Sequence, residues 1–364
     1  MSFANVTHFM ESLKDKGVVG ADLGIYLRGH EVYRHQVGYA DLEAQAPVTA
    51  NTLFAIWSMT KVVTCVAALR LLEQGRFLPA DPLSDYMPEF SHMTYRNEAG
   101  EVVPCTRPIR VVDLFTMSSG VAYQIEAGEA SCDSLTALAH AIAKEPLHCE
   151  PGTRWIYGYS HDLLGAFIER VTGQKASELF HKEIFEPLGM GETFFHQYIT
   201  PENAARLANL YKYDAATHTH TRGQHANWTF ENCGGGLVSS VSDYAKFANA
   251  LCNHGTAANG YKLLGQATVD LMRMNHLCER RMNDHHAQWA TTGYGYGLGV
   301  RTHLDRAHSG MNANPGEYGW AGYLGTYFAI DPAAQLTYVY AHQLSPSLEG
   351  HIAPRLKNVI YASI

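Results

Sequence analysis

A serine and a lysine three residues apart are the clearest catalytic candidates in the sequence. Ser58 follows the short apolar run 53–57 and precedes a helical pattern over 59–73, so Lys61 lies on the same helix face as Ser58. The unpaired amides and the dipole of a first helical turn favour negative charge on the Ser58 oxygen, and the Ser58 N–H can serve an oxyanion. That dipole and apolar neighbours are expected to lower the pKa of Lys61, which suits a general base.

The spacing by itself also fits a helix-capping serine followed by an exposed lysine. The neighbouring residues favour catalysis, because the chain from 51 to 61 reads N-T-L-F-A-I-W-S-M-T-K. Further matching stretches are L-E-Q-G-R-F at 72–77, D-P at 81–82, M-P-E-F at 87–90, I-R-V-V-D-L-F-T-M-S-S-G at 109–120 and G-G-G-L-V-S-S at 234–240. Together they resemble the serine β-lactamase and penicillin-recognising enzyme superfamily, nearest to its class C β-lactamase-like branch and the family VIII carboxylesterases. Met117 stands where that family often has histidine.

The resemblance implies a third catalytic residue, Tyr157. Residues 151–157 read P-G-T-R-W-I-Y, and register against Gly165 places the family's motif tyrosine at Tyr157. A phenol near Lys61 can relay protons to a leaving group, although a packed core tyrosine is the alternative. The family has asparagine two residues later, where it binds the amide of β-lactams and peptides, but here the residue is Tyr159. We expect Tyr159 to contribute to the substrate site.

A third motif is expected on a strand that flanks the site. Residues 319–326 read G-W-A-G-Y-L-G-T, which resembles the W-G-G form of the esterase-like relatives, and the K-T-G form is absent. The small residues Ala321 and Gly322, after Trp320, would let a substrate backbone lie against the strand. The Tyr323 N–H would then be the second oxyanion donor beside that of Ser58. His308-Ser309-Gly310 is a rival that resembles an H-x-G variant of this motif.

These residues imply acyl transfer from a small-molecule ester or amide, with neither a metal nor a cofactor. We predict a serine hydrolase, with an esterase favoured over a β-lactamase or D-amino-acid peptidase because positions 159 and 320–322 depart from the β-lactamase pattern. A transacylase and a non-catalytic binding or sensor protein of the same fold are further alternatives. An apolar or aromatic acyl group would suit the aromatic residues expected around the cleft, which are Trp57, Tyr123, Trp155, Tyr159, Trp228, Trp320 and Tyr323.

The elements that must position these residues change in character along the chain. The two ends of the chain have a strand pattern, with a hairpin over 23–39 and strand-like runs at 296–301, 316–323, 326–330 and 336–342. The middle is helical, with helices expected at 111–117, 134–144, 161–172 and 176–183. Outside this middle region, helices are expected near residues 3–16, over 349–361 and over 241–253, the last of which is opened by Ser242 and Asp243. The order predicts an α+β fold of the β-lactamase/transpeptidase type. Residues 1–76 and 231–364 would form an antiparallel sheet domain flanked by helices, and 77–230 an inserted, mostly helical domain.

Composition excludes several other classes of function. The 364 residues carry a net charge of −8 without a basic block, so a nucleic-acid partner is not expected. No secretory pattern and no apolar run of about 18 residues occurs, which predicts a cytoplasmic protein with no membrane span. The seven cysteines form no C-x-x-C, and the twenty histidines, including the pairs 218/220 and 285/286, lack metal-ligand spacing. We interpret them as reduced thiols and mainly solvated loop histidines. Oligomeric state is not specified by any of these patterns.

Overall fold

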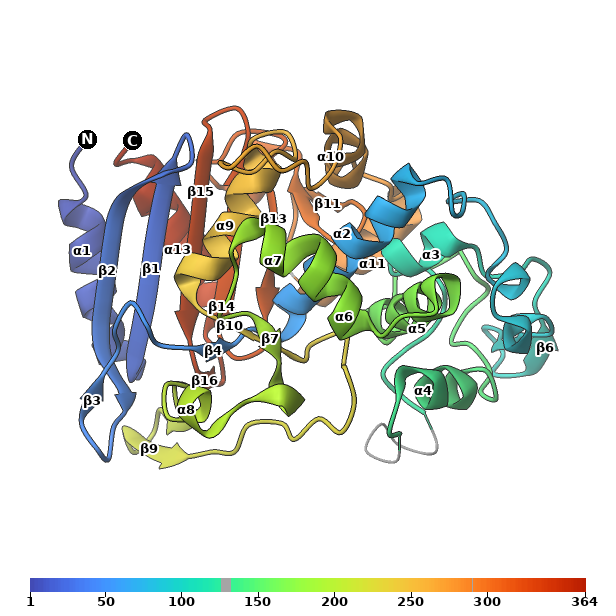
Figure 1. Ribbon diagram of the computed structural model, residues 1–364, viewed down its shortest axis with the longest axis horizontal. Helices are drawn as coiled ribbons and strands as arrows, with labels where there is room; N and C mark the ends of the chain where they lie inside the picture. The colour runs from blue at the N-terminus through green and yellow to red at the C-terminus, as the bar shows by residue number, and fades with distance from the viewer. Residues whose placement is uncertain (126–131, 290) are drawn as a thin grey trace.

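A large antiparallel sheet organises the computed structural model, which describes residues 1–125, 132–289 and 291–364. Its eight strands run in the order β11-β12-β13-β14-β15-β1-β2-β3. The first and last parts of the chain lie side by side in it (Figure 1), because β1 pairs with β15. The strands are β1 (Gly20–Leu27), β2 (His30–Asp41), β3 (Ala46–Pro47), β11 (Tyr294–Tyr296), β12 (Arg301–His303), β13 (Tyr318–Gly322), β14 (Thr326–Asp331) and β15 (Leu336–His342). The predicted fold class is thereby confirmed.

Both faces of the sheet are covered by helices. Side chains alternate along β14, so Tyr327 and Ala329 join one core while Phe328 and Ile330 join the other. Helices α1 (Ala4–Glu11) and α13 (Glu349–Tyr361) pack together on the first face. Helix α9 (Val241–Cys252) lies on the second face against β1, β14 and β15, as Figure 1 shows.

Helix α2 (Thr60–Glu73) lies between the sheet and the helices of the middle region. The helical pattern over 59–73 is confirmed, and every residue from Thr60 to Leu69 is buried, because α2 packs against α5 and α6. The other helices of this region are α3 (Val111–Phe115), α4 (Leu135–Ile142), α5 (Ser160–Thr172), α6 (Ala176–Phe180), α7 (Glu186–Leu188) and α8 (Pro201–Ala204). The turn that carries Ser58 is therefore followed directly by a buried helix.

Three small sheets complete the described part of the chain. They consist of β4 (Phe54–Ala55) with β10 (Leu237–Ser239) and β7 (Phe194–Phe195); β16 (Leu344–Ser345) with β8 (Tyr211–Asp214) and β9 (Thr219–Arg222); and β5 (Thr94–Arg96) with β6 (Val102–Pro104). Helices α10 (Gln266–Arg273), α11 (Glu279–Trp289) and α12 (Arg306–Ser309) connect the last part. None of these three helices was expected from the sequence.

Two local expectations from the sequence are wrong. Residues 296–301 do not form one strand; a turn closed by the Gly297 N–H and the Val300 carbonyl, 2.7 Å apart, separates β11 from β12. Gly299 adopts a φ of +87° there, which favours glycine. Helix α9 begins at Val241 as expected, but its capping residue is Ser240, whose hydroxyl accepts the Asp243 N–H at 3.1 Å, and not Ser242 or Asp243.

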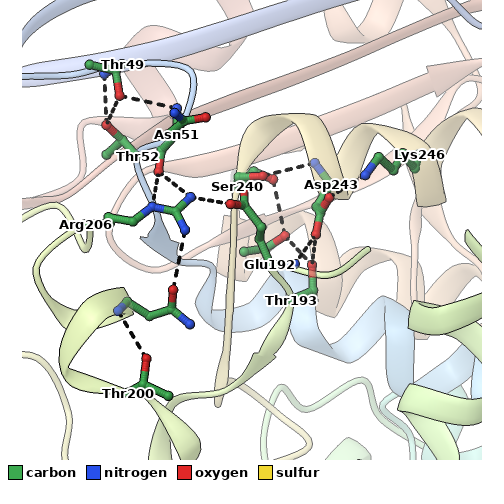
Figure 2. Close-up of polar contacts among 12 residues, drawn as sticks. Thr49, Asn51, Thr52, Glu192, Thr193, Thr200, Arg206, Ser240, Asp243 and Lys246 are labelled. Carbon is green, nitrogen blue, oxygen red and sulfur yellow. Dashed lines mark hydrogen bonds and ion pairs between the residues drawn. The ribbon is translucent and has the colours of Figure 1, made fainter. Parts of the chain in front are cut away.

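A polar network fixes the segment that leads into β4 (Figure 2). Arg206 donates to the Asn51 carbonyl from two nitrogens, at 3.0 and 2.8 Å, and also pairs with Glu192. Asp243, at the start of α9, accepts the Glu192 N–H at 2.7 Å. The network therefore joins α9 to the chain just upstream of Ser58, with Thr193 in contact with the same carboxylate.

Candidate active site

Ser58 lies in a single 3₁₀ turn, Trp57–Met59, immediately before α2. Two contacts fix the residue that precedes this turn: the Ile56 N–H donates to Leu237 at 3.0 Å, and the Thr326 hydroxyl donates to the Ile56 carbonyl at 3.0 Å. Trp57 has a φ of +46°, an uncommon conformation for a residue with a side chain. Strain of this kind persists only where the surroundings impose it, and it is frequent at functional sites.

Lys61 contacts Ser58 directly. Its Nζ lies 3.2 Å from the Ser58 Oγ and 2.5 Å from the Gly234 carbonyl oxygen. The residue is only 1% exposed. The glycine-rich stretch at 234–236 thus supplies an acceptor for Lys61. Among the described residues this arrangement brings the predicted nucleophile and the predicted amine into contact.

The pKa of Lys61 shifts in the direction opposite to the one expected from the sequence. Burial lowers it, as anticipated, but Tyr123, Tyr157 and Asp162 together raise it above its ordinary value. The Nζ lies 5.7 Å from the ring centre of Tyr123 and 4.9 Å from that of Tyr157. Lys61 is therefore a cation at neutral pH, positioned to stabilise negative charge on neighbouring oxygens.

Asp162 supports Lys61 through the backbone of Gly234. Its Oδ1 accepts the Gly234 N–H at 2.8 Å, and the Gly234 carbonyl accepts from Lys61. A side chain at position 234 would place its Cβ 2.3 Å from the Asp162 Oδ2, so only glycine permits this approach. Burial raises the pKa of Asp162 to about 6, although Lys61 lowers it. The carboxylate is consequently charged above that pH and holds the lysine in its ammonium form.

Replacing Asp162 by asparagine should change the pH dependence of ester hydrolysis. In the wild type, kcat/KM should fall as the pH drops below about 6, because Asp162 becomes protonated there. D162N keeps an acceptor for Gly234 but never carries charge, so this acidic limb should be absent and the activity at higher pH about tenfold lower. An acidic limb that persists unchanged in D162N would contradict this assignment.

The same substitution should alter stability against pH. The folded-state pKa of Asp162 lies above its ordinary value of 3.8, so the folded state binds this proton more tightly than the unfolded state. The contribution of Asp162 to the free energy of unfolding should therefore decrease as pH rises from about 4 to about 6. Thermal melting across that range should show a decrease in the wild type that is smaller in D162N.

Tyr157 reaches the site from the loop that precedes α5. The Trp320 Nε1–H donates to the Tyr157 hydroxyl oxygen at 3.3 Å, which connects the segment at 151–157 with the motif at 319–326. The ring stacks on Trp155 at 6.0 Å between centroids. Upstream, the Ile156 N–H donates to the Met117 carbonyl at 2.8 Å. Met117 is fully buried with a φ of +53°, so in this protein it supports the Tyr157 loop through its backbone.

A cavity of about 290 Å³ opens onto Ser58. Within the described part of the chain it is lined by Ser58, Tyr157, His285, Trp289, Thr291, Arg301, Trp320, Ala321, Gly322, Tyr323, Ser347 and Glu349. Strand β12 pairs with β13 only at Gly319 and Tyr318, which leaves Ala321 and Gly322 without a strand neighbour on that side. A substrate can therefore lie along the free edge of β13.

Gly322 has a steric reason to lack a side chain. A Cβ there would lie 2.3 Å from the Ile56 carbonyl oxygen, two residues before Ser58. The close approach places the third motif against the turn that carries the nucleophile. Tyr323 follows it with 67% of its surface exposed and packs edge-on against Trp57, with 5.5 Å between ring centres.

Several of the aromatic residues expected at the cleft lie elsewhere. Tyr159 does not line the cavity; it is buried, and its ring packs edge-on against Tyr123 at 4.8 Å. Trp155 is also buried, behind Tyr157, and Trp228 contacts Trp57. None of the residues of the rival motif at 308–310 lines this cavity, and His308 is exposed on α12, where it pairs with Asp305.

The cavity also contains residues that sequence reasoning missed or misplaced. His285 was interpreted as a solvated loop residue, but it lies in α11 and is fully buried. The polar composition of α11 suggests a solvated segment, but His285 lies on its buried face and packs on Trp155 and Tyr296. Arg301 was assigned to the end of a strand with no role. Only alternation along β12 could have indicated that its side chain lies beside the motif of β13.

Within the described ranges, no group of three or more potential metal-ligating side chains occurs. None of the seven cysteines forms a disulfide bond within the described residues. Nor does the described part of the chain include a helix with the length and apolar character needed to cross a membrane.

A Ser-Lys pair at the start of a central helix, between a sheet and a helical region, defines a serine hydrolase of the β-lactamase/transpeptidase fold. The chain belongs to the Beta-lactamase family, whose sequence model matches residues 4–360. Similar proteins include Protein Rv1367c of Mycobacterium tuberculosis, 30% identical over 92% of this chain and 88% of that protein. Esterase EstB of Burkholderia gladioli is 24% identical over 97% of this chain and 93% of its own length.

Solved structures agree with this fold. The structure described as EstCE1, a hydrolase with promiscuous acyltransferase activity, superposes with a TM-score of 0.83 at 22% identity. The match covers 99% of this chain and 98% of that one. The resemblance inferred from the motifs is therefore confirmed.

Proposed function

We propose that this protein is a serine esterase that forms an acyl-enzyme on Ser58. The observation that carries the proposal is the 3.2 Å contact between the Lys61 Nζ and the Ser58 Oγ at a cavity also lined by Tyr157. An oxygen nucleophile beside a buried cation and a phenol is equipped for acyl transfer. The similarity to Esterase EstB supports an ester as the substrate.

Lys61 and Tyr157 have separate roles in this mechanism. Because the pKa of Lys61 is raised, the lysine stays an ammonium and stabilises negative charge on the Ser58 oxygen. The Ser58 Oγ forms a bond to the ester carbonyl carbon while its proton passes to the Tyr157 oxygen, and the phenol's own proton passes to the departing alkoxide as the ester C–O bond breaks, so Tyr157 ends the step as it began. Water attacks the acyl-enzyme by the same route, which releases the acid and restores the Ser58 hydroxyl.

The oxyanion of each tetrahedral intermediate is assigned to the N–H groups of Ser58 and Tyr323. Both residues line the cavity, and the close approach of Gly322 to Ile56 holds β13 against the serine turn. Two backbone donors at fixed positions stabilise developing charge without reorganisation. Lys61, which is buried and cationic, adds a favourable field at the Ser58 oxygen.

An ester is favoured over a β-lactam or peptide because the cavity lacks a carboxamide side chain. None of its described lining residues is asparagine or glutamine, and Tyr159, at the position of the family's amide-binding residue, is buried outside it. An amide substrate would need a partner for its N–H and carbonyl groups, whereas an ester presents fewer groups to satisfy.

Intact-protein mass spectrometry would test this proposal. The protein is incubated with 4-nitrophenyl esters, D-alanyl dipeptides and a chromogenic cephalosporin, and peptide mapping locates any added mass. We expect a transient acyl increment on Ser58 from esters at rates well above those from the other two classes. Faster acylation by the cephalosporin or the dipeptide would reject the esterase assignment. Added short-chain alcohols would reveal a transacylase if ester products exceed the free acid.

A further inference from the structure

The turn that carries Tyr323 is bonded to the chain at the end of strand β15. This turn joins β13 to β14. The His342 N–H donates to the Gly325 carbonyl at 3.3 Å, and the Leu344 N–H donates to the Leu324 carbonyl at 3.0 Å. Two backbone contacts therefore fix the turn to the segment in which β15 ends.

The His342 imidazole packs directly against the backbone of Gly325. A Cβ at position 325 would lie 1.9 Å from the His342 Nε2, and Gly325 has a φ of +103°, so a residue with a side chain is excluded there. The imidazole is itself fixed, because its Nδ1 lies 2.8 Å from the hydroxyl oxygen of the buried Tyr340. Burial lowers the pKa of His342 to about 4, against a raising effect of the Ser347 backbone, so the ring is neutral at physiological pH. A rigid, uncharged ring thus limits how far the turn can move toward β15.

Gln343, the next residue, extends this support to the chain that leads into Ser58. The residue is buried, and its Nε2 donates to the Ala55 carbonyl at 3.1 Å. Ala55 belongs to β4 and lies three residues before Ser58. The same amide nitrogen donates to the His342 carbonyl at 2.7 Å, so one side chain joins β4 to the end of β15. Two adjacent residues therefore contact both segments that carry the proposed oxyanion donors.

We propose that His342 and Gln343 are positioning residues that set the spacing between the two proposed oxyanion donors. This inference rests on the proposed esterase function. His342 acts on the Tyr323 N–H through the turn, whereas Gln343 acts through β4 on the N–H of Ser58. Neither positioning residue is among the described residues that line the Ser58 cavity. Their effect is indirect, because an oxyanion hole stabilises charge only while its donors stay at fixed positions.

Paired substrates that differ only in the carbonyl atom would test this assignment. 4-Nitrophenyl acetate and 4-nitrophenyl thionoacetate share the leaving group and the methyl group, but the second develops its negative charge on sulfur. Sulfur is larger than oxygen and a weaker hydrogen-bond acceptor, so a well-formed oxyanion hole favours the ester. In the wild type, kcat/KM should be about 100-fold higher for the ester. This ratio is independent of the concentration of folded enzyme, so partial unfolding of a variant leaves it unchanged.

Removal of either support should reduce the ratio. His342→Ala and Gln343→Met should each lower it about tenfold, through a loss of kcat for the ester with KM changed less than about twofold. His342→Gln, whose amide can reach the position of the imidazole Nε2, should retain more of the ratio than His342→Ala. Tyr338→Phe is the matched control, since Tyr338 is buried on β15 and its hydroxyl contacts that of Tyr327 at 2.8 Å. It loses one buried hydrogen bond away from the turn and should keep the wild-type ratio.

A double variant tests the contact between the imidazole and the turn. Gly325→Ala should lower kcat/KM for 4-nitrophenyl acetate, because its Cβ would meet the His342 ring. His342→Ala removes that ring, so the two changes should not act independently. The double variant should be at least about threefold more active than the product of the single effects predicts. Independent effects would contradict a role that depends on this contact.

A reversible inhibitor makes the result independent of turnover. Phenylboronic acid bonds to a serine oxygen and forms a tetrahedral adduct, one oxygen of which takes the place of the oxyanion. Its affinity should weaken about tenfold in His342→Ala and Gln343→Met and stay unchanged in Tyr338→Phe. Absence of ester hydrolysis by the wild type would reject the proposed function, while the inhibitor would still measure the effect of the two supports. A folded variant with the wild-type ester ratio and inhibitor affinity would reject the positioning role of the replaced residue alone.

Discussion

Replacement of Ser58 by alanine is expected to reduce kcat for a 4-nitrophenyl ester by about 10⁴-fold or more. The variant loses the only atom that can form the acyl bond in the proposed mechanism, so catalysis would be limited to positioning and oxyanion stabilisation. A 10⁴-fold loss corresponds to about 5 kcal/mol of transition-state stabilisation. Steady-state hydrolysis, with the rate in buffer subtracted, measures this loss directly.

The matched control for Ser58→Ala is Ser91→Ala. Ser91 is exposed and donates its hydroxyl to the Pro88 carbonyl at 2.6 Å, outside the site, so its loss should leave kcat unchanged. Both variants should melt within a few degrees of the wild type. If Ser58→Ala hydrolyses the ester at a rate close to that of the parent, another residue is the nucleophile.

Replacement of Lys61 by methionine should reduce kcat by about 10³- to 10⁴-fold, with a smaller change in KM. Methionine fills a similar volume but removes the cation that stabilises charge on the Ser58 and Tyr157 oxygens. An interaction made mainly in the transition state affects kcat more than KM. Acylation measured in a single turnover would separate this effect from product release.

The same variant should also lose stability, because the Gly234 carbonyl would be left without its donor. An unsatisfied buried carbonyl costs about 1–3 kcal/mol. Lys246→Met is a suitable control, since Lys246 also donates to a backbone carbonyl, that of Gly189, and pairs with Asp243, but it does not line the Ser58 cavity. It should destabilise the protein modestly and leave kcat intact. A Lys61→Met enzyme within tenfold of wild-type kcat would rule out an essential cation.

Local spacing indicated that Ser58 and Lys61 share one face at the start of a helix, and the family resemblance of the neighbouring residues favoured the catalytic interpretation over a capping serine. Alternation and turn residues likewise indicated β1, β2, β13, β14 and β15 of the eight-stranded sheet, and helix α13 occurs over 349–361 as expected. The confirmed family resemblance supplied Tyr157 and the motif at 319–326, through register rather than through periodicity. These features depend on neighbours in the chain, which the sequence specifies directly.

The tertiary structure alone decided the properties that depend on residues distant in the chain. The pKa of Lys61 is raised because Tyr123, Tyr157 and Asp162, from other elements, outweigh its burial. Tyr159 is buried beside Tyr123 instead of lining the cavity. His285 and Arg301 reach the cavity from α11 and β12, elements whose packing no local pattern encodes. Electrostatic fields and cavity walls are sums over such contacts, and only the folded chain brings their contributors within a few ångströms of Ser58.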